Sequence, residues 1–149
     1  MLKKAKEISS GGVIFRKRRG RVEVALISTK GGKVWGLPKG LVEEHENIAR
    51  TAHREVAEET GLDGKILKNL GHIEYFYSHK EGTELTRIFK IVYFFLMEYT
   101  AGDVADHDEE VEECRWFPID TAIDLMKFDD EKGIIRKAKE ELRERGYIK

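Results

Sequence analysis

A group of glutamates in the segment GLVEEHENIARTAHREVAEETGL, residues 40–62, has a spacing that could do metal chemistry. Glu55, Glu58 and Glu59 stand at i, i+3 and i+4, so on a helix their side chains would share one face. Like charges at i and i+4 cost about 0.2–0.5 kcal/mol per pair unless a counter-charge is present. Hard carboxylate oxygens at this density suit Mg²⁺ or Mn²⁺, and such an ion would remove the repulsion.

An ordinary solvated helix face is the alternative interpretation, with Arg54 and Glu58 forming an i, i+4 ion pair. The position of the glutamates on the helix favours a metal site over a solvated face. At about 100° per residue, the acidic stripe borders the apolar stripe of Ile48, Ala52 and Val56 instead of lying opposite it. The carboxylates should therefore lie where the helix meets the rest of the fold.

The glutamates belong to a longer pattern, G-x5-E-x7-R-E-U-x-E-E-x-G-U with U apolar, which the chain matches without exception. The matching residues are Gly40, Glu46, Arg54, Glu55, Val56, Glu58, Glu59, Gly61 and Leu62. This segment resembles the complete Nudix box. The resemblance implies an α/β (α+β) fold, a Nudix-like α/β/α sandwich with a mixed central β-sheet. It also implies hydrolysis of a nucleoside diphosphate linked to a further group X.

The resemblance implies roles for the box residues as well. In the family, the residues matching Glu55, Glu58 and Glu59 bind metal, often with the backbone carbonyl of the residue matching Gly40. The residue matching Arg54 orients a glutamate. The chemistry requires such ions, because a negatively charged pyrophosphate bridge resists attack by water until its oxygens are neutralised. We expect Mg²⁺ as the cofactor, with Mn²⁺ as the alternative.

The residue that activates the attacking water is left open by the sequence. In the family it is either a box glutamate or one on a distant loop. The acidic loop TAGDVADHDEEVEE, residues 100–113, offers Glu110 as the first candidate and Glu109 as its rival. A solvated acidic loop is the alternative interpretation of both residues.

The substrate is suggested by WGLPKG, residues 35–40, which resembles the diadenosine polyphosphate hydrolase branch of the family. That branch also often has a tyrosine near the position of Tyr77. Asymmetric cleavage of diadenosine tetraphosphate into ATP and AMP is the expected reaction. Such a substrate needs cations for its phosphates and a flat apolar surface for adenine. The candidate substrate-binding residues are Lys39, Tyr77, Arg87, His79 and Lys80.

Other functions remain open. A nucleoside triphosphate or ADP-ribose pyrophosphatase would use the same metal helix with a different recognition surface. An RNA 5′-pyrophosphohydrolase and a non-catalytic nucleotide sensor are further alternatives.

The composition of the chain argues against extended nucleic acid and membranes as partners. The 149 residues suit a single domain, 1–149, and 27 basic against 28 acidic residues leave no bulk field to hold extended nucleic acid or a membrane surface. No apolar run could span a bilayer, and the N-terminus lacks an apolar signal region, so we expect a cytoplasmic protein. Oligomeric state is not predicted. The charged content of 37% and the absence of glutamine resemble heat-adapted proteins.

The elements that must position these residues follow from apolar periodicity. Residues 47–60 form the firmest predicted helix, with Asn47 as N-cap and Gly61 as its stop. Asp120 is the expected N-cap of a short helix ending at residue 126. The remaining predictions are strands over residues 8–15, 22–27, 65–78, 84–99 and 113–119, a loop with at most a brief strand over 28–40, and a last helix over 130–145.

Overall fold

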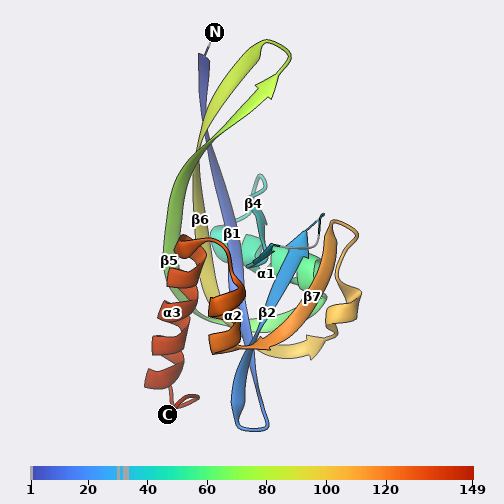
Figure 1. Cartoon of the computed structure of the whole chain (residues 1–149), viewed down its shortest axis with the longest axis vertical. Helices are drawn as coiled ribbons and strands as arrows, with labels where there is room; N and C mark the ends of the chain where they lie inside the picture. Colours follow the sequence, from blue (N-terminus) through green and yellow to red (C-terminus); the bar gives the residue numbers. More distant parts are fainter. Residues whose placement is uncertain (1, 30, 32–33) are drawn as a thin grey trace.

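The computed structural model describes residues 2–29, 31 and 34–149 (Figure 1). Within these residues, seven strands form one mixed sheet of order β3-β2-β1-β6-β5, with β4 added beside β1 and β7 beside β2. The strands are β1 (Leu2–Arg18), β2 (Arg21–Thr29), β3 (Trp35–Gly36), β4 (Lys39–Leu41), β5 (Leu62–Glu81), β6 (Glu84–Gly102) and β7 (Val111–Pro118). The helices are α1 (Ile48–Thr60), α2 (Ile119–Leu125) and α3 (Asp129–Glu144), with a short 3₁₀ helix at Val104–Asp106.

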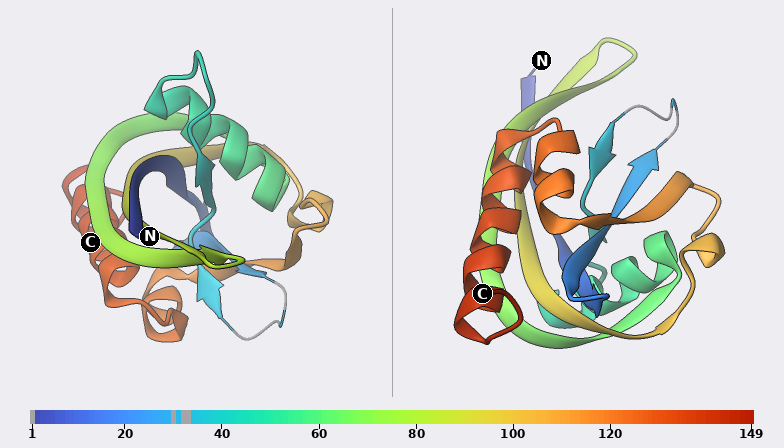
Figure 2. Two further views of the ribbon diagram at one scale, coloured as in Figure 1. Left: turned by 90° about the horizontal axis from the view of Figure 1, so that it is seen from above. Right: turned by 60° about the horizontal axis from the view of Figure 1, so that its bottom comes forward.

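The sheet separates two apolar cores. Because successive side chains of a strand point to opposite faces, Phe94 and Leu96 of β6 pack with α2 and α3, whereas Phe95 and Met97 pack with α1. Figure 2 shows α1 on one side of the sheet and α2 and α3 on the other. β1 runs parallel to β6 and antiparallel to β2, which makes the sheet mixed. The predicted α/β/α sandwich is therefore confirmed.

Helix α1 forms where the local signals place it. The Asn47 side chain accepts a hydrogen bond from the Arg50 amide at 2.8 Å, which satisfies one free donor of the first turn. Gly61 ends the helix with φ of 76°, a conformation that glycine adopts without strain. Both predicted ends of this helix are confirmed.

Asp120 is not an N-cap, and that prediction is wrong. Strand β7 runs directly into α2 through Pro118, which takes the cap position without a side-chain hydrogen bond. Asp120 is the second residue of α2, and its carboxylate binds the Lys139 ammonium of α3 at 2.6 Å. The carboxylate thus joins two helices instead of starting one.

Three strands are longer than their apolar runs predict, and they form an arm that projects from the body (Figure 1). We define the arm as residues 2–8 of β1, 73–81 of β5 and 84–91 of β6. The prediction missed residues 2–7 of β1 because three lysines and a glutamate leave no apolar alternation there, and most of these residues are exposed. Part of the predicted loop over 28–40, at residues 30, 32 and 33, lies outside the described residues.

No helix among the described residues combines the length and apolar character needed to cross a membrane.

Candidate functional site

The box glutamates of α1 lie against the backbone of β4. An added Cβ at Gly40 would stand 2.1 Å from the carboxyl carbon of Glu55, so a larger residue could not occupy this position without displacing the carboxylate. β4 is held there by antiparallel pairing with β1, where Gly40 faces Ser10. The pairing of β4 with β1 therefore brings the Gly40 peptide beside a helix carboxylate.

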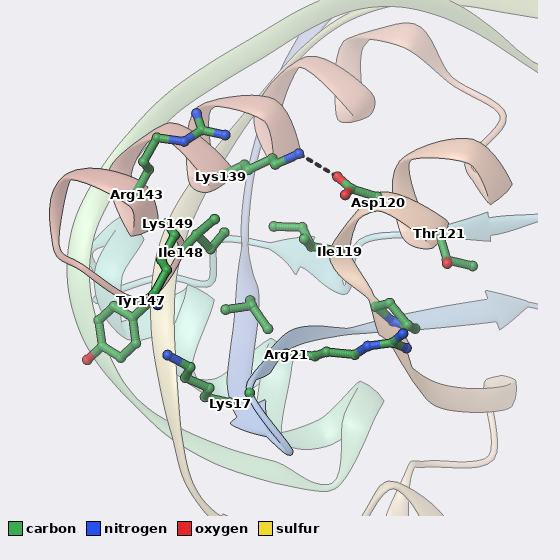
Figure 3. Close-up of a pocket in the computed structure, with 13 residues that line it drawn as sticks. Lys17, Arg21, Ile119, Asp120, Thr121, Lys139, Arg143, Tyr147, Ile148 and Lys149 are labelled. Carbon is green, nitrogen blue, oxygen red and sulfur yellow. Dashed lines mark hydrogen bonds and ion pairs between the residues drawn. The ribbon is translucent and has the colours of Figure 1, made fainter.

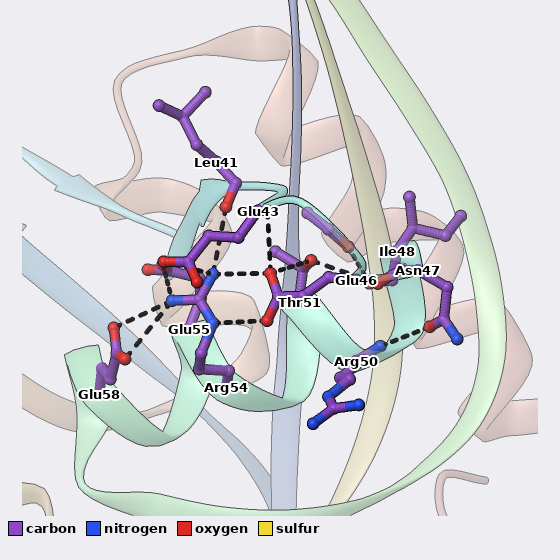
Figure 4. A network of polar contacts seen from close by, with 11 residues as sticks. Leu41, Glu43, Glu46, Asn47, Ile48, Arg50, Thr51, Arg54, Glu55 and Glu58 are labelled. Atoms are coloured by element: carbon purple, nitrogen blue, oxygen red, sulfur yellow. Dashed lines mark hydrogen bonds and ion pairs between the residues drawn. The ribbon is translucent and has the colours of Figure 1, made fainter.

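Arg54 joins the loop before α1 to the glutamates on α1 (Figure 4). Its Nε donates to Glu46 at 2.7 Å, and one terminal nitrogen donates to Glu55 at 2.7 Å and to Glu58 at 3.3 Å. The other terminal nitrogen donates to the Leu41 carbonyl at 3.2 Å. Hydrogen bonding to Arg54 lowers the pKa of Glu46 to about 2. The guanidinium therefore fixes the loop and orients two of the three candidate metal ligands.

Glu59 is held differently, by the backbone at the start of β4. One of its carboxyl oxygens accepts the Lys39 amide hydrogen at 2.7 Å. Burial raises its pKa to about 7 despite this hydrogen bond, and burial also raises the pKa of Glu55. The negative charge of Asp108 contributes to both upward shifts. Burial and neighbouring negative charge thus both oppose ionisation of these two carboxyls.

The donor set at this place fits a divalent cation. Three carboxylates and a nearby peptide carbonyl are hard oxygen donors, and a cation would supply the charge that Glu55 and Glu59 lack. Across the described ranges, no three acidic, histidine or cysteine side chains already converge on a point that could hold a metal ion. The reason is visible in the contacts, because Arg54 holds Glu55 and Glu58 while the Lys39 amide holds Glu59.

The two candidate bases lie on the turn before β7. Glu109 and Glu110 are both exposed there. The turn reaches the metal helix through its preceding residue, since the Asp108 amide donates to the Glu58 carbonyl at 2.9 Å. Sequence reasoning did not select Asp108. The loop contains several acidic residues, and nothing in the sequence distinguishes Asp108 from the others. Its contact with α1 is visible only in the fold.

The Lys39 side chain reaches α3, whereas its backbone amide contacts Glu59 of α1. Its ammonium binds Glu131 at 3.0 Å, and the nearly fully buried Glu131 also accepts the Leu37 amide hydrogen at 2.8 Å. A cavity of about 310 Å³ opens beside this pair, lined by Lys39, Ile73, Tyr75, Phe128, Asp130 and Glu131. Its lining combines the aromatic rings of Tyr75 and Phe128 with the carboxylates of Asp130 and Glu131. Its α3 residues are 90 or more positions from Lys39 in the chain, so no local pattern could reveal them.

The other candidate substrate contacts lie along the arm. The Tyr77 hydroxyl donates to Glu7, and this bond raises the pKa of Tyr77 to about 12. Arg87 lies over the Phe76 ring at 4.7 Å, on the face opposite to Tyr77. His79 and Lys80 follow further toward the tip of the arm. The structure does not bring these four residues together with Lys39.

A second cavity, of about 920 Å³, lies near the C-terminal end of the chain (Figure 3). Cationic side chains dominate its rim, including Lys17, Arg21 and Arg143. It contains none of the box residues. The cavity beside Lys39 also contains no box residue, but it adjoins the glutamate helix because the Lys39 amide donates to Glu59. A third cavity, of about 580 Å³, is lined by the box residues Glu46 and Arg54 together with Glu43, Glu44 and His45 of the loop before α1.

Comparison with known proteins agrees with the fold and with the box. A family model described as NUDIX domain matches residues 6–142. An 8-oxo-(d)GTP phosphatase of Mycolicibacterium smegmatis is 33% identical over 116 residues, covering 78% of this chain and 33% of the relative. An asymmetrical bis(5′-nucleosyl)-tetraphosphatase of Sus scrofa is 29% identical over 140 residues, covering 85% of this chain and 89% of the relative.

Solved structures share the fold at lower identity. The Ap4A hydrolase of C. elegans, in a binary complex, superposes with a TM-score of 0.69 at 22% identity, covering 93% of this chain and 98% of that chain. The chain spans about half the length or less of several curated relatives that it matches. Because the family model covers nearly the whole chain, and the box and the sandwich are both present, the chain belongs to the Nudix family.

Proposed function

We propose that this Nudix hydrolase cleaves diadenosine tetraphosphate asymmetrically into ATP and AMP, with Mg²⁺ as its cofactor. The observation that carries the proposal is the cavity beside Lys39, which places an ammonium group and the rings of Tyr75 and Phe128 next to the glutamate helix. The likeness to asymmetrical tetraphosphatases supports it.

Glu55, Glu58, Glu59 and the carbonyl of Gly40 would hold the metal ions. Bound Mg²⁺ would neutralise the phosphates and lower the pKa of a water molecule; Mn²⁺ could take the same oxygen ligands. Arg54 would keep the helix and loop in the geometry that the ions need, because it already fixes Glu46 and Glu55. Glu110, with Glu109 as its rival, would take the proton from the attacking water if a box glutamate does not.

Lys39 would bind the phosphate chain. Its ammonium is now neutralised by Glu131 at 3.0 Å, so a phosphate would compete with that carboxylate for the same cation. The adenine ring would lie between Tyr75 and Phe128, whose side chains are 37% and 54% exposed. A flat base would cover this apolar surface.

Cleavage of a nucleoside triphosphate is the second candidate, and the carboxylates of the same cavity favour it. Asp130 and Glu131 are acceptors, so they would suit a base edge that presents N–H donors, as a guanine or oxidised guanine does. The likeness to an 8-oxo-(d)GTP phosphatase agrees with this alternative.

Product analysis separates these functions. The purified protein is incubated with Mg²⁺ and, in separate reactions, with diadenosine tetraphosphate, ADP-ribose and dGTP. ATP plus AMP from the first compound alone supports the proposal. Faster cleavage of dGTP or ADP-ribose would reject diadenosine tetraphosphate as the substrate but would still agree with a Nudix hydrolysis. Absence of cleavage in all three reactions would favour an RNA 5′-pyrophosphohydrolase or a nucleotide sensor.

A further inference from the structure

The arm exposes an unusual share of the apolar surface. Of the ten large hydrophobic residues that are exposed in the described part of the chain, six lie on the arm. They are Leu2, Ile8, Tyr75, Phe76, Tyr77 and Leu85. Phe76 is the most exposed of all ten, at 59%. They lie on both faces of the arm, because Tyr75 and Tyr77 point to one face and the other four residues to the opposite one. Apolar residues exposed in this number mark a segment that another molecule contacts.

The outer strand of the arm is also an open edge. Among the described residues, β5 pairs only with β6, so half of its backbone amides and carbonyls face outward. Soluble proteins usually protect such edges with proline, bulges, short strands or charged side chains, and of these the edge of β5 has only charges, at Glu74, Lys80 and Glu81. From Gly71 to Glu81, β5 has no proline and its pairing with β6 has no register shift. This edge is long, regular and free to accept another strand.

The sequence of the edge is complementary to itself in one register. When a strand pairs antiparallel with its own copy about a two-fold axis, one residue must face its equivalent. With Tyr77 at the axis, Glu74 faces Lys80 of the partner subunit, and the symmetry produces this ion pair twice. A centre at Phe76 or Ser78 pairs neither charge with an opposite one. Residues directly opposite lie about 4.5–5.5 Å apart at Cβ, close enough for the pair to form.

We propose that the protein forms a symmetric dimer in which β5 pairs antiparallel with β5 of a second copy, centred on Tyr77. The two arms then join into one six-stranded ribbon, because each contributes three strands. Phe76 lies diagonal to its symmetry equivalent, so the most exposed ring of the arm becomes covered.

The pairing gives each nucleotide site a residue from the other chain. In this register Tyr75, which lines the cavity beside Lys39, faces His79 of the partner subunit. His79 of the same chain lies near the tip of its own arm, away from that cavity. The imidazole is therefore a substrate contact in trans; this second step rests on the proposed function, whereas the dimer does not.

Charge exchange at the strand pair tests the dimer itself. Light scattering behind size exclusion, across protein concentrations and at low salt, should give twice the chain mass of 17.2 kDa for the wild type. E74K places two lysines opposite each other at both ends, and K80E does the same with glutamates. Each single variant should weaken dimerisation by roughly tenfold or more. The double variant E74K/K80E restores opposite charges and should dimerise again.

E144K is the matched control, since it makes the same charge reversal at an exposed residue of α3. It should leave the dimer unchanged. A wild-type protein that stays monomeric at all concentrations overturns the proposal. So does a dimer that is indifferent to E74K, or one that the double variant fails to restore, because each result places the contact elsewhere.

Mixed dimers test the contribution of His79. H79A should lower activity, and E59Q should abolish it. In a mixed dimer, the H79A chain retains Glu59 and receives His79 from the partner subunit, so mixing the two variants should recover activity. If H79A is impaired and mixing recovers nothing, His79 acts within its own chain and the register is wrong. The mass measurement needs no substrate. It therefore tests the dimer even if the proposed substrate is wrong.

Discussion

Glu59 is the residue where burial and charge conflict most strongly. Burial raises the pKa of Glu59 to about 7. The pKa of the neighbouring Glu55 is raised as well. An apolar residue would be more stable in such a place unless a cation binds there. The cost of keeping these glutamates is the physical reason to assign them a function.

Replacing Glu59 by glutamine should remove most of the activity and little of the stability. The amide keeps the side chain's shape and can still accept from the Lys39 amide, but it cannot ligate a cation as an anion does. We expect turnover in Mg²⁺ to fall by at least about 100-fold, because even residues that only orient metal ligands are typically worth 10–100-fold. Steady-state kinetics and a thermal melt measure the two effects. Glu44→Gln, at an exposed position outside the box pattern, is the control. Wild-type turnover by E59Q would refute the metal assignment.

Gly40→Ala should lower activity through geometry alone. The new methyl group would overlap the Glu55 carboxyl, which stands 2.1 Å away, so that carboxylate or β4 must move. Gly133→Ala is the control, because its Cβ would meet no heavy atom within 4 Å and it lies within α3. Alanine in a helix interior gains roughly 0.5–1 kcal/mol over glycine. G40A should thus lose activity and stability while G133A gains stability. Unchanged kinetics for G40A would show that the carboxylate contact is not needed.

Elements were predictable where their signals are local. α1 could be placed from Asn47, Gly61 and an apolar stripe, all within one short segment. Asp120 was misassigned because the start of α2 depends on how β7 enters it through Pro118, and Lys139 then attracts the carboxylate from a different helix. The arm was underestimated because pairing among three strands, and not apolar alternation, extends it.

The contact between α3 and β5 should depend on pH through Glu141. Its carboxylate accepts from Lys68 of β5 at 2.9 Å and from Arg145 at 2.7 Å. The hydrogen bond from Lys68, followed by that from Arg145, lowers the pKa of Glu141 below the ordinary value of a glutamate. A lowered pKa in the folded state means that the stabilisation is present above the unfolded pKa and is lost as the pH falls through the folded value.

Glu141→Gln should therefore lower the melting temperature at pH 7, and the difference from the wild type should shrink when both melts are repeated near pH 3. Glu144→Gln, at an exposed residue of the same turn, should show a smaller difference at either pH. A deficit in E141Q that is equal at both pH values would mean that packing, and not charge, accounts for the loss.

At the scale of the whole molecule, the sequence predicts the candidate metal site but not the cavity beside it. The box is contiguous, so its spacing alone identified Arg54 and the three glutamates. Glu131, in contrast, reaches the Lys39 loop from α3, and Tyr75 reaches it from β5. The residues that line the proposed nucleotide cavity come from β4, β5 and the start of α3, which only the sandwich brings together, so the sequence did not select Tyr75 or Glu131.

The composition predicts that the whole molecule resists heat. Charged residues make up 37% of the chain, and the described contacts organise many of them into networks, such as Arg54 with its glutamates and Lys68 with Glu141 and Arg145. Networks of this kind gain relative importance at high temperature, because the cost of removing charges from water falls as temperature rises. Calorimetry should give a melting midpoint above the range of about 45–65 °C typical of mesophilic domains. Because surface ion pairs are screened by salt, raising NaCl toward 1 M should lower that midpoint. A midpoint within the mesophilic range would reject heat adaptation, and a midpoint above it that is insensitive to salt would assign the stability to the two apolar cores instead.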